Sequence, residues 1–209
     1  SGHRWSGGPA RHDLLAMNRY RLPFHGGQPF GSVLLNYGCP FSCTFCNTGE
    51  LPYKLRDIGE ALDELRIIRK MGIKAAYIRD ATANGKYAHW LSFCQSLAKE
   101  SLDLKWNVFC TYQPFDAKLA QTMANAGCTV VQFGFETANE GLRAETGKAF
   151  GNEAAKAAVR YCHEAGIRVC GHFVLGLPGQ SEEEIRASAH FARQLDLDYA
   201  SFNLATARP

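Results

Sequence analysis

Hydrophobic positions along this chain alternate between short continuous runs and longer stretches with helical spacing. Ala61, Leu62, Leu65 and Ile68 recur at the interval that places apolar side chains on one face of a helix. Continuous apolar runs instead predict strands buried on both faces. The predicted strands are Ser32–Tyr37, Ala75–Arg79, Leu104–Tyr112, Val130–Glu136, Arg168–Gly176 and Tyr199–Leu204, and the predicted helices are Ile58–Met71, Ala88–Glu100, Asp116–Ala126, Asn152–Ala165 and Ser181–Leu195.

Glycines mark the joints between these elements. Gly72, Gly127 and Gly166 each follow a predicted helix and precede a strand, where glycine takes the left-handed conformation without a side-chain penalty. Ser181 and Glu184 form a capping box at the start of the last helix. The alternation predicts an α/β fold of parallel strands covered by helices. A doubly wound sheet and a full or partial barrel both fit, although six strands are fewer than the eight of a full barrel.

The two ends of the chain differ from this pattern. Residues 1–31 are rich in Gly, Pro, Arg and His without periodicity, which predicts a linker or lead-in before a core domain at 32–209. The first residues have no apolar core of the kind that a signal peptide requires. The chain stops just beyond the sixth strand, where a sixth helix is expected. We therefore expect a fold truncated after the sixth strand, in a fragment of a longer protein.

Composition narrows the class of protein. The 209 residues are 46% hydrophobic and 21% charged, which is typical of a globular domain and excludes disorder. No apolar run approaches the ~18 residues of a membrane span, so no membrane association is expected. A net charge of +3 without a basic block gives no support for nucleic-acid binding. Eight cysteines favour a reducing compartment, and we expect the protein to be cytoplasmic.

Three of the cysteines lie within eight residues, at Cys39, Cys43 and Cys46, in the loop after the first predicted strand. Loops at the carboxyl ends of parallel strands carry active sites. A structural zinc site usually takes four ligands in two separated pairs, and no second pair is present. Three thiolates would leave one iron of a 4Fe–4S cluster without a protein ligand, which is an open position for catalysis. The other five cysteines are predicted to be buried small hydrophobes.

The C-x3-C-x2-C loop, with Phe45 before its last cysteine, resembles the signature of the radical S-adenosylmethionine (SAM) superfamily. The resemblance covers residues 32–209 and implies a partial (β/α)6 barrel of the TIM type. It implies that the three cysteines bind a 4Fe–4S cluster and that SAM chelates the fourth iron. One electron would then cleave SAM to methionine and a 5′-deoxyadenosyl radical.

Further residues match this family strand by strand. The resemblance puts Asp80 near the SAM amino group, Glu136 near the ribose or methionine, and Lys148 near the SAM carboxylate. The alternative for Asp80 is a turn or helix cap. For Glu136 it is an ordinary strand-end carboxylate, and for Lys148 a solvated lysine. The resemblance further implies that the fifth strand and the loop after it, Gly171–Gln180, lie beside the adenine and that Asn203 faces the adenosyl group. The full set of implied cofactor-binding residues is Phe45, Asp80, Thr82, Gly134, Glu136, Thr137, Lys148, Phe173, Leu175, Gly176, Pro178 and Asn203.

Residues 8–15, the fifth-strand loop and residues 203–209 resemble the cobalamin-binding branch, which includes methyltransferases and the anaerobic magnesium-protoporphyrin ester cyclase. This implies methylation of an unactivated carbon, with cobalamin bound in the parent protein. Cobalamin-independent oxidative cyclisation or methylthiolation, and a non-catalytic iron–sulfur or zinc module, stay open. The expected partners are a small-molecule or peptide substrate and a reductant such as flavodoxin or ferredoxin.

Overall fold

A six-stranded parallel sheet forms the centre of the computed structural model, which describes residues 3–6 and 8–206. The spatial order of the strands is their order in the chain, so each helical connection leads to the next strand along the sheet. A doubly wound sheet would reverse direction partway. The predicted partial barrel is therefore confirmed. The strands are β2 (Phe30–Val33), β5 (Ala75–Ile78), β6 (Lys105–Cys110), β7 (Cys128–Glu136), β8 (Arg168–Leu175) and β9 (Tyr199–Leu204).

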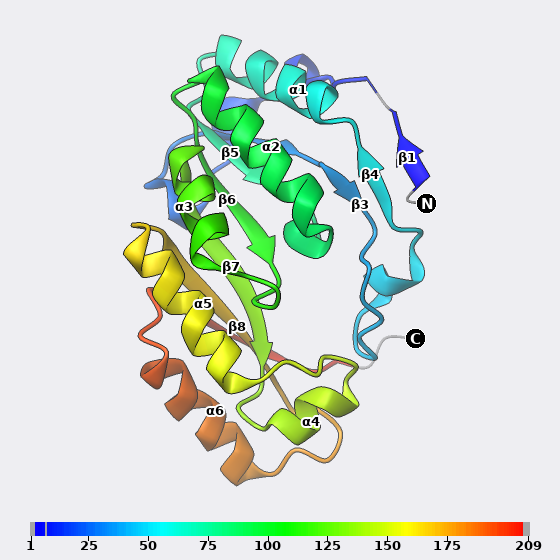
Figure 1. Ribbon diagram of the computed structural model, residues 1–209, viewed down its shortest axis with the longest axis vertical. Coiled ribbons are helices and arrows are strands. Elements are labelled where there is room, and N and C mark those ends of the chain that lie inside the picture. Colours follow the sequence, from blue (N-terminus) through cyan, green and yellow to red (C-terminus); the bar gives the residue numbers. More distant parts are fainter. Residues whose placement is uncertain (1–2, 7, 207–209) are drawn as a thin grey trace.

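The five predicted helices are present and lie along one side of the sheet (Figure 1). They begin and end within about two residues of the predicted bounds, because caps and glycines fix both ends. Gly72, Gly127 and Gly166 have φ angles of 82°, 95° and 75°, and the capping box at Ser181 is formed. The helices are α1 (Ile58–Lys70), α2 (Tyr87–Glu100), α3 (Ala117–Asn125), α5 (Asn152–Glu164) and α6 (Glu182–Gln194).

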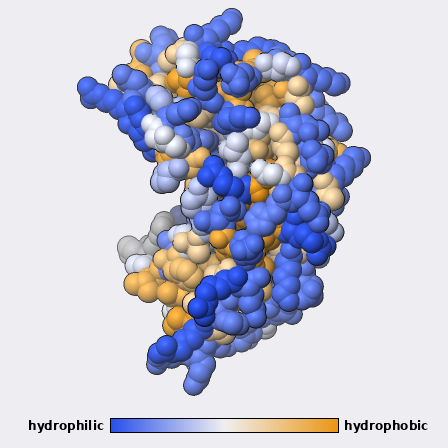
Figure 2. All heavy atoms as spheres, turned by 90° about the vertical axis from the view of Figure 1, so that its left-hand side faces the viewer, coloured by the Kyte–Doolittle hydropathy of each residue, from blue (hydrophilic) through white to orange (hydrophobic). Residues whose placement is uncertain are grey.

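The hydrophobic core lies between these helices and one face of the sheet. On β6, Trp106 and Val108 belong to this core, while the alternate residue Asn107 faces the other way. We call the face opposite the helices the inner face. Six strands leave a barrel open on one side, and Figure 2 shows a hollow in the outline of the molecule midway along its longest axis. Hydrophobic side chains gather on the part of this surface below the hollow.

The first predicted strand is divided in two. β2 ends at Val33, and β3 (Asn36–Tyr37) pairs instead with β4 (Lys54–Arg56), which also pairs with β1 (His3–Trp5) in a small separate sheet. The carboxylate of Asp80 accepts hydrogen bonds from the backbone amides of Leu35 and Asn36, at 2.8 and 2.9 Å. These bonds remove both amides from the main sheet, which turns the chain toward the cysteine loop. The short helix α4 (Glu140–Glu145) was not predicted either.

Residues 8–29, predicted as a linker or lead-in, contain three short 3-10 turns at His12–Leu14, Met17–Arg19 and Pro23–His25. His12 is buried and lies 2.8 Å from the carboxylate of Glu64 on α1. The other oxygen of Glu64 accepts a hydrogen bond from Arg56 at 2.5 Å. All three side chains are at most 4% exposed, so a buried ionic cluster attaches the lead-in to α1 and β4.

The same segment crosses the amino ends of the sheet. His25 Nε2 lies 2.7 Å from the amide oxygen of Asn107 on β6. The ring of Phe24 packs edge-on against Tyr199 at the start of β9, and Arg168 at the start of β8 donates to the Phe24 carbonyl. The lead-in therefore covers the end of the barrel opposite the cysteine loop. Residues 1, 2, 7 and 207–209, which belong to the lead-in and to the closing stretch of the resemblance, lie outside the described residues.

Within residues 3–6 and 8–206, no helix is long and apolar enough to cross a membrane.

Candidate active site

The cysteine loop lies at the carboxyl edge of the sheet, between β3 and a short 3-10 turn at Asn47–Glu50. Cys39 and Cys43 are half-buried and Cys46 is exposed, and all three thiols are free. The amide of Cys46 donates to the carbonyl of Cys43 at 3.0 Å, which closes a turn between the last two cysteines. Phe45 lies on this turn with its side chain 43% exposed. The three thiols and this aromatic ring are therefore at least partly accessible to solvent.

Close backbone contacts hold the loop in shape. Gly49 lies so near the Phe41 carbonyl that an added Cβ would approach it closer than 3.0 Å, and only a glycine fits there. From the segment that follows β7, the carbonyl of Thr146 accepts a hydrogen bond from the amide of Thr44 at 3.0 Å. Gly147 packs beside Ser42, since a Cβ added to this glycine would lie 3.1 Å from the Ser42 carbonyl oxygen. The turn at Gly49 and one distant segment, at Thr146 and Gly147, therefore fix the path of the loop.

The three thiols of the loop fit the donor set of an iron–sulfur cluster. A 4Fe–4S cluster takes each thiolate on a different iron, so three cysteines on one loop could bind three of its four irons. Across the described part of the chain, no three His, Cys, Asp or Glu side chains converge on one point where a single metal ion could bind. Burial raises the pKa of the Cys43 thiol, and the ammonium of Lys148 opposes this rise. The nearby cation thus offsets only part of this rise.

Asp80 and Thr82, which follow β5, lie beside the same loop. Thr82 lies 3.7 Å from the sulfur of Cys39, at weak hydrogen-bond distance. Asp80 is 1% exposed, and its Oδ1 accepts from the amides of Leu35 and Asn36, while its Oδ2 has no hydrogen-bond partner among the described residues. Burial raises the pKa of this carboxyl to about 7, although the two amides act against the rise. Asp80 therefore shapes the start of the cysteine loop and has one oxygen still available.

A buried ion pair at the end of β7 lies close to Cys43. Lys148 Nζ is 2.8 Å from Oε1 of Glu136 and 2.5 Å from the Gly134 carbonyl, and the side chains of the pair are 15% and 9% exposed. A Cβ on Gly134 would come closer than 3.0 Å to both charged groups, so glycine makes room for the pair. Both Glu136 and Lys148 act electrostatically on Cys43.

The backbone of β7 is distorted to produce this arrangement. The register with β8 shifts between Gly134 and Glu136, and Glu136 has a φ angle of 63° in the left-handed region. A bulge re-aims the side chain that follows it, and a non-glycine residue in this region is strained. The strained backbone is that of Glu136, whose carboxylate pairs with Lys148. Such outliers concentrate at functional sites, which supports a role for this pair beyond packing.

Thr137 and the segment after it are organised by an arginine that no sequence motif singles out. Thr137 is fully buried, and its hydroxyl lies 3.3 Å from that of Ser188 on α6. Arg143 is also fully buried and donates to the carbonyls of Phe135, Thr137 and Phe150. It thereby holds the chain that carries Lys148. No local signal in the sequence could have found this arginine, because its acceptors are backbone carbonyls that only the fold brings together.

The stretch expected beside the adenine forms the end of β8 and a tight turn. Gly176 has a φ angle of 78°, and its amide donates to the side chain of Gln180 at 2.7 Å. Leu175 is half-buried and Pro178 is exposed on this turn. Phe173 is fully buried, stacked on the ring of Phe202 at 5.1 Å. Phe173 therefore supports the strand from the helix side, whereas Gly176 and Pro178 lie at the rim.

Asn203 lies near the end of β9, opposite Val174 of β8. Its side chain is exposed and donates to Ser201 at 3.3 Å. The cysteine loop, Thr82 and the Glu136–Lys148 pair are thus in mutual reach, as their contacts show. The Gly176 turn is linked to the end of β7 through Gln180, whose amide donates to the Thr137 hydroxyl at 3.5 Å. Among the described residues, no hydrogen bond joins Asn203 to this group.

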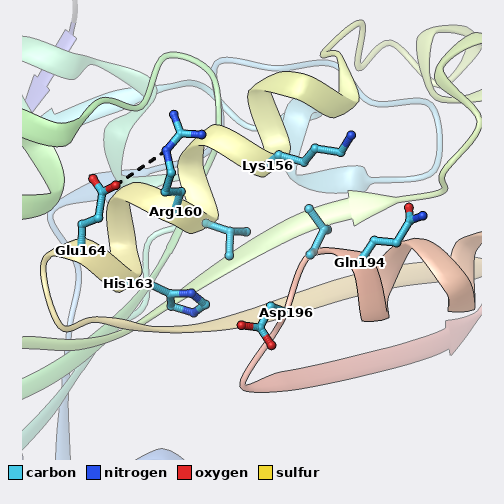
Figure 3. A pocket seen from close by; sticks show the side chains of 8 residues that line it. Lys156, Arg160, His163, Glu164, Gln194 and Asp196 are labelled. Atoms are coloured by element: carbon cyan, nitrogen blue, oxygen red, sulfur yellow. Dashed lines mark ion pairs between the residues drawn. The ribbon is translucent and has the colours of Figure 1, made fainter.

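A small pocket also lies between α5 and α6, far from this edge (Figure 3). Lys156, Arg160, His163 and Glu164 of α5 line one side, and Gln194 and Asp196 line the other. It lies where these helices run into the amino ends of β8 and β9. Catalytic residues of such folds gather at the opposite, carboxyl end of the strands, so we assign the pocket no part in catalysis.

A parallel sheet with a three-thiol loop and a strained, buried ion pair at its carboxyl edge defines an α/β-barrel enzyme. The pattern of the radical SAM superfamily matches residues 33–192. The chain therefore belongs to the radical SAM superfamily, as the cysteine loop predicted.

Similar proteins point to one branch of this family. An uncharacterized methyltransferase of Pyrococcus horikoshii is 32% identical over 95% of this chain and 43% of its own length. An anaerobic magnesium-protoporphyrin IX monomethyl ester cyclase of Rubrivivax gelatinosus is 26% identical over 82% of this chain and 32% of its own. The chain spans less than half the length of each of these two relatives.

Among solved structures, the radical SAM methyltransferase TsrM of Kitasatospora setae, with cobalamin and a 4Fe–4S cluster bound, has a TM-score of 0.79 and 25% identity. The match covers 85% of this chain and 34% of that one. The predicted resemblance to the branch of methyltransferases and cyclases is confirmed.

Proposed function

We propose that this chain is the SAM-cleaving core of a methyltransferase, with a 4Fe–4S cluster bound by Cys39, Cys43 and Cys46. The observation that carries the proposal is the position of three free thiols on one preformed loop at the carboxyl edge of the sheet. When bound, the cluster supplies the electron that cleaves SAM to methionine and a 5′-deoxyadenosyl radical. Phe45, on the same loop, would place an apolar ring beside the cluster and limit the access of water to the thiolates.

The ion pair beside Cys43 would bind the amino-acid end of SAM. Glu136 and Lys148 present one carboxylate and one ammonium group, and the methionine part of SAM carries one of each in the opposite sense. Exchange of an internal ion pair for two intermolecular ones keeps every charge compensated, which a buried site requires. The free Oδ2 of Asp80 and the hydroxyl of Thr82 would serve the amino group from the neighbouring strand.

The rim of the last strands would hold the nucleoside. Gly134 and Thr137 shape the end of β7, and Gly176 and Pro178 leave their turn open for close approach of a planar base. Leu175 would back the base, with Phe173 supporting the strand from behind, and Asn203 is exposed for hydrogen bonding to the adenosyl group.

Methylation of an unactivated carbon with cobalamin is the activity we favour for the whole protein. The support is the similarity to methyltransferases, one of which has cobalamin bound in its solved structure. Oxidative cyclisation is the second candidate, because a cyclase is also similar over most of this chain. We further propose a small-molecule or peptide substrate, a flavodoxin or ferredoxin as reductant, and a cytoplasmic location.

Anaerobic reconstitution with iron and sulfide tests the proposal. The chain should bind about four irons and gain the visible absorption of a cluster, and Cys39→Ala, Cys43→Ala or Cys46→Ala should abolish it. Cys94→Ala is the matched control, because Cys94 is a free thiol buried in the core. With SAM and dithionite, the reconstituted protein should release 5′-deoxyadenosine. If Cys94→Ala loses the cluster equally, or if zinc alone restores the native metal content, the proposal is wrong.

A further inference from the structure

A tight turn joins the last two cysteines of the loop. The amide of Cys46 donates to the carbonyl of Cys43 at 3.0 Å, so residues 43–46 form a β-turn. The α-carbons at the two ends of a β-turn lie less than about 7 Å apart. A disulfide bridge requires α-carbons about 4.4–6.8 Å apart. The backbone of this turn therefore brings the two cysteines to the separation at which their sulfurs can be joined.

Cys39 is placed differently from this pair. Its sulfur lies 3.7 Å from the hydroxyl of Thr82, on the segment that follows β5. The ring of Phe41 packs edge-on against Phe150 at 5.8 Å, which holds the chain between Cys39 and Cys43. Among the described residues, no backbone hydrogen bond joins Cys39 to either of the other two cysteines. The turn geometry of a disulfide thus belongs to Cys43 and Cys46.

The turn is anchored on its first half and exposed on its second. The amide of Thr44 donates to the Thr146 carbonyl at 3.0 Å. Phe45 and Cys46 are exposed instead, so their side chains are not enclosed by the core. Rotation of the Cys46 side chain toward Cys43 therefore leaves the anchored residues in place.

The remaining cysteines are shielded from small oxidants. All five are buried, and burial raises the pKa of each of their thiols. The thiolate is the nucleophile in thiol–disulfide exchange, so these thiols react slowly. They are Cys94, Cys110, Cys128, Cys162 and Cys170. A small disulfide in solution therefore meets the exposed Cys46 first.

We propose that Cys43 and Cys46 form a reversible disulfide before the cluster is loaded, with a small-molecule disulfide of the glutathione type as oxidant. The thiolate of Cys46 attacks one sulfur of the oxidant and releases one thiol, which leaves a mixed disulfide. The thiolate of Cys43 then attacks the Cys46 sulfur and releases the second thiol. Two protein thiols are oxidised, one small disulfide is reduced, and the two protons pass to the released thiols.

The bridge would control when a cluster can be assembled. Metals bind the thiolate form of cysteine, and a disulfide has no thiolate, so the bridged loop retains one of its three ligands. Reduction of the bridge restores the other two. In reducing compartments, disulfides of this kind are transient and respond to the redox state. The control of loading rests on the proposed function, whereas the bridge itself depends only on the turn.

Oxidation of the metal-free chain by glutathione disulfide tests the bridge. Two of the eight thiols should be lost, and dithiothreitol should restore both. After the remaining thiols are blocked, chymotrypsin cleaves behind Phe41 and Phe45 and so separates the three loop cysteines. Mass spectrometry should then find the fragment that contains Cys43 linked to the fragment that contains Cys46.

Three variants and a matched control assign the bridge. Cys39→Ala should still lose two thiols to the same bridge. Cys43→Ala and Cys46→Ala should lose the bridge, and the thiol that is left should carry glutathione as a mixed disulfide. Cys94→Ala removes a buried thiol of the core and should behave as the parent does. Circular dichroism verifies that each variant is folded.

Transfer of a preformed 4Fe–4S cluster from a carrier protein, without added thiol or sulfide, tests the control of loading. The reduced chain should gain the visible absorption of the cluster. The bridged chain should not gain it until it has been reduced with dithiothreitol and freed from the reagent by gel filtration. Equal transfer to both forms would overturn the control of loading.

The outcomes separate this inference from the proposed function. In the parent chain, a bridge that includes Cys39, or glutathione adducts in place of a bridge, overturns the inference. If the bridge forms but the reduced chain accepts no cluster, the proposed function fails and the disulfide stands. If the reduced chain accepts a cluster but the loop never bridges, the disulfide is wrong and the proposed function stands.

Discussion

Replacement of Asp80 by asparagine should stabilise the protein at alkaline pH. The Asp80 carboxyl is fully buried, and burial raises its pKa from 3.8 to about 7. Each pKa unit corresponds to about 1.4 kcal/mol, so ionisation of Asp80 costs about 4 kcal/mol more in the folded protein than in the unfolded chain. Asparagine keeps the oxygen that accepts from Leu35 and Asn36 but never ionises.

The sign of the pH dependence follows from which state of the protein, folded or unfolded, keeps the proton on Asp80. Between about pH 4 and pH 7 the folded protein keeps a proton on Asp80 that the unfolded chain has lost. The free energy of unfolding contributed by Asp80 is therefore fully present below about pH 4 and falls by about 1.4 kcal/mol per unit as pH rises, until the folded pKa is passed. The stability of Asp80→Asn relative to the parent should thus grow by about 3 kcal/mol from about pH 5 to about pH 8.

Urea denaturation at several pH values, followed by circular dichroism, measures this difference. Burial lowers the pKa of His25 and of His172, and these groups add a pH dependence of the opposite sign. Both histidines are present in parent and variant, so the difference between the two proteins isolates Asp80. Gln121→Ala, which changes an exposed side chain that does not titrate, is the control and should give a constant difference. A difference for Asp80→Asn that is equal at pH 5 and pH 8 would refute the reasoning.

Two further substitutions test the buried ion pairs, and a third at an exposed pair is the control. Glu136→Gln keeps the size of the side chain but removes the charge. SAM binding, measured by calorimetry on cluster-loaded protein, should weaken roughly 10- to 150-fold while the fold stays intact. Normal SAM affinity would contradict the assignment of Glu136 on β7 but not that of the cluster. Glu64→Ala leaves the buried Arg56 without its nearest carboxylate and should lower the free energy of unfolding by about 3 kcal/mol. Glu153→Ala, which breaks an exposed pair with Lys156, should change it by less than about 1 kcal/mol, and equal losses would show that burial does not decide the outcome.

Local signals in the sequence predicted most of the fold. Helical spacing, continuous apolar runs and the glycines at 72, 127 and 166 each act over a few residues, and all six strands and five helices followed from them. The position of the cysteine loop was equally accessible, because its three thiols are neighbours in the chain. Membership of the radical SAM family followed from the same short motif.

Contacts between distant residues could not be predicted in the same way. The break between β2 and β3 depends on a carboxylate more than forty residues further on, since Asp80 takes the amides of Leu35 and Asn36. The pairing of Glu136 with Lys148 depends on a bulge and a left-handed backbone angle, and neither has a sequence signature at a glutamate. The cofactor contacts proposed for these residues stay predictions that the variants above can decide.

The lead-in packed across the amino ends of the strands has a consequence for access to the inner face. Its Phe24 and His25 contacts close the end of the barrel opposite the cysteine loop. The sheet itself is open between its first and last strands, β2 and β9. Molecules that reach the inner face therefore enter at the edge that carries the cysteine loop or through this open side.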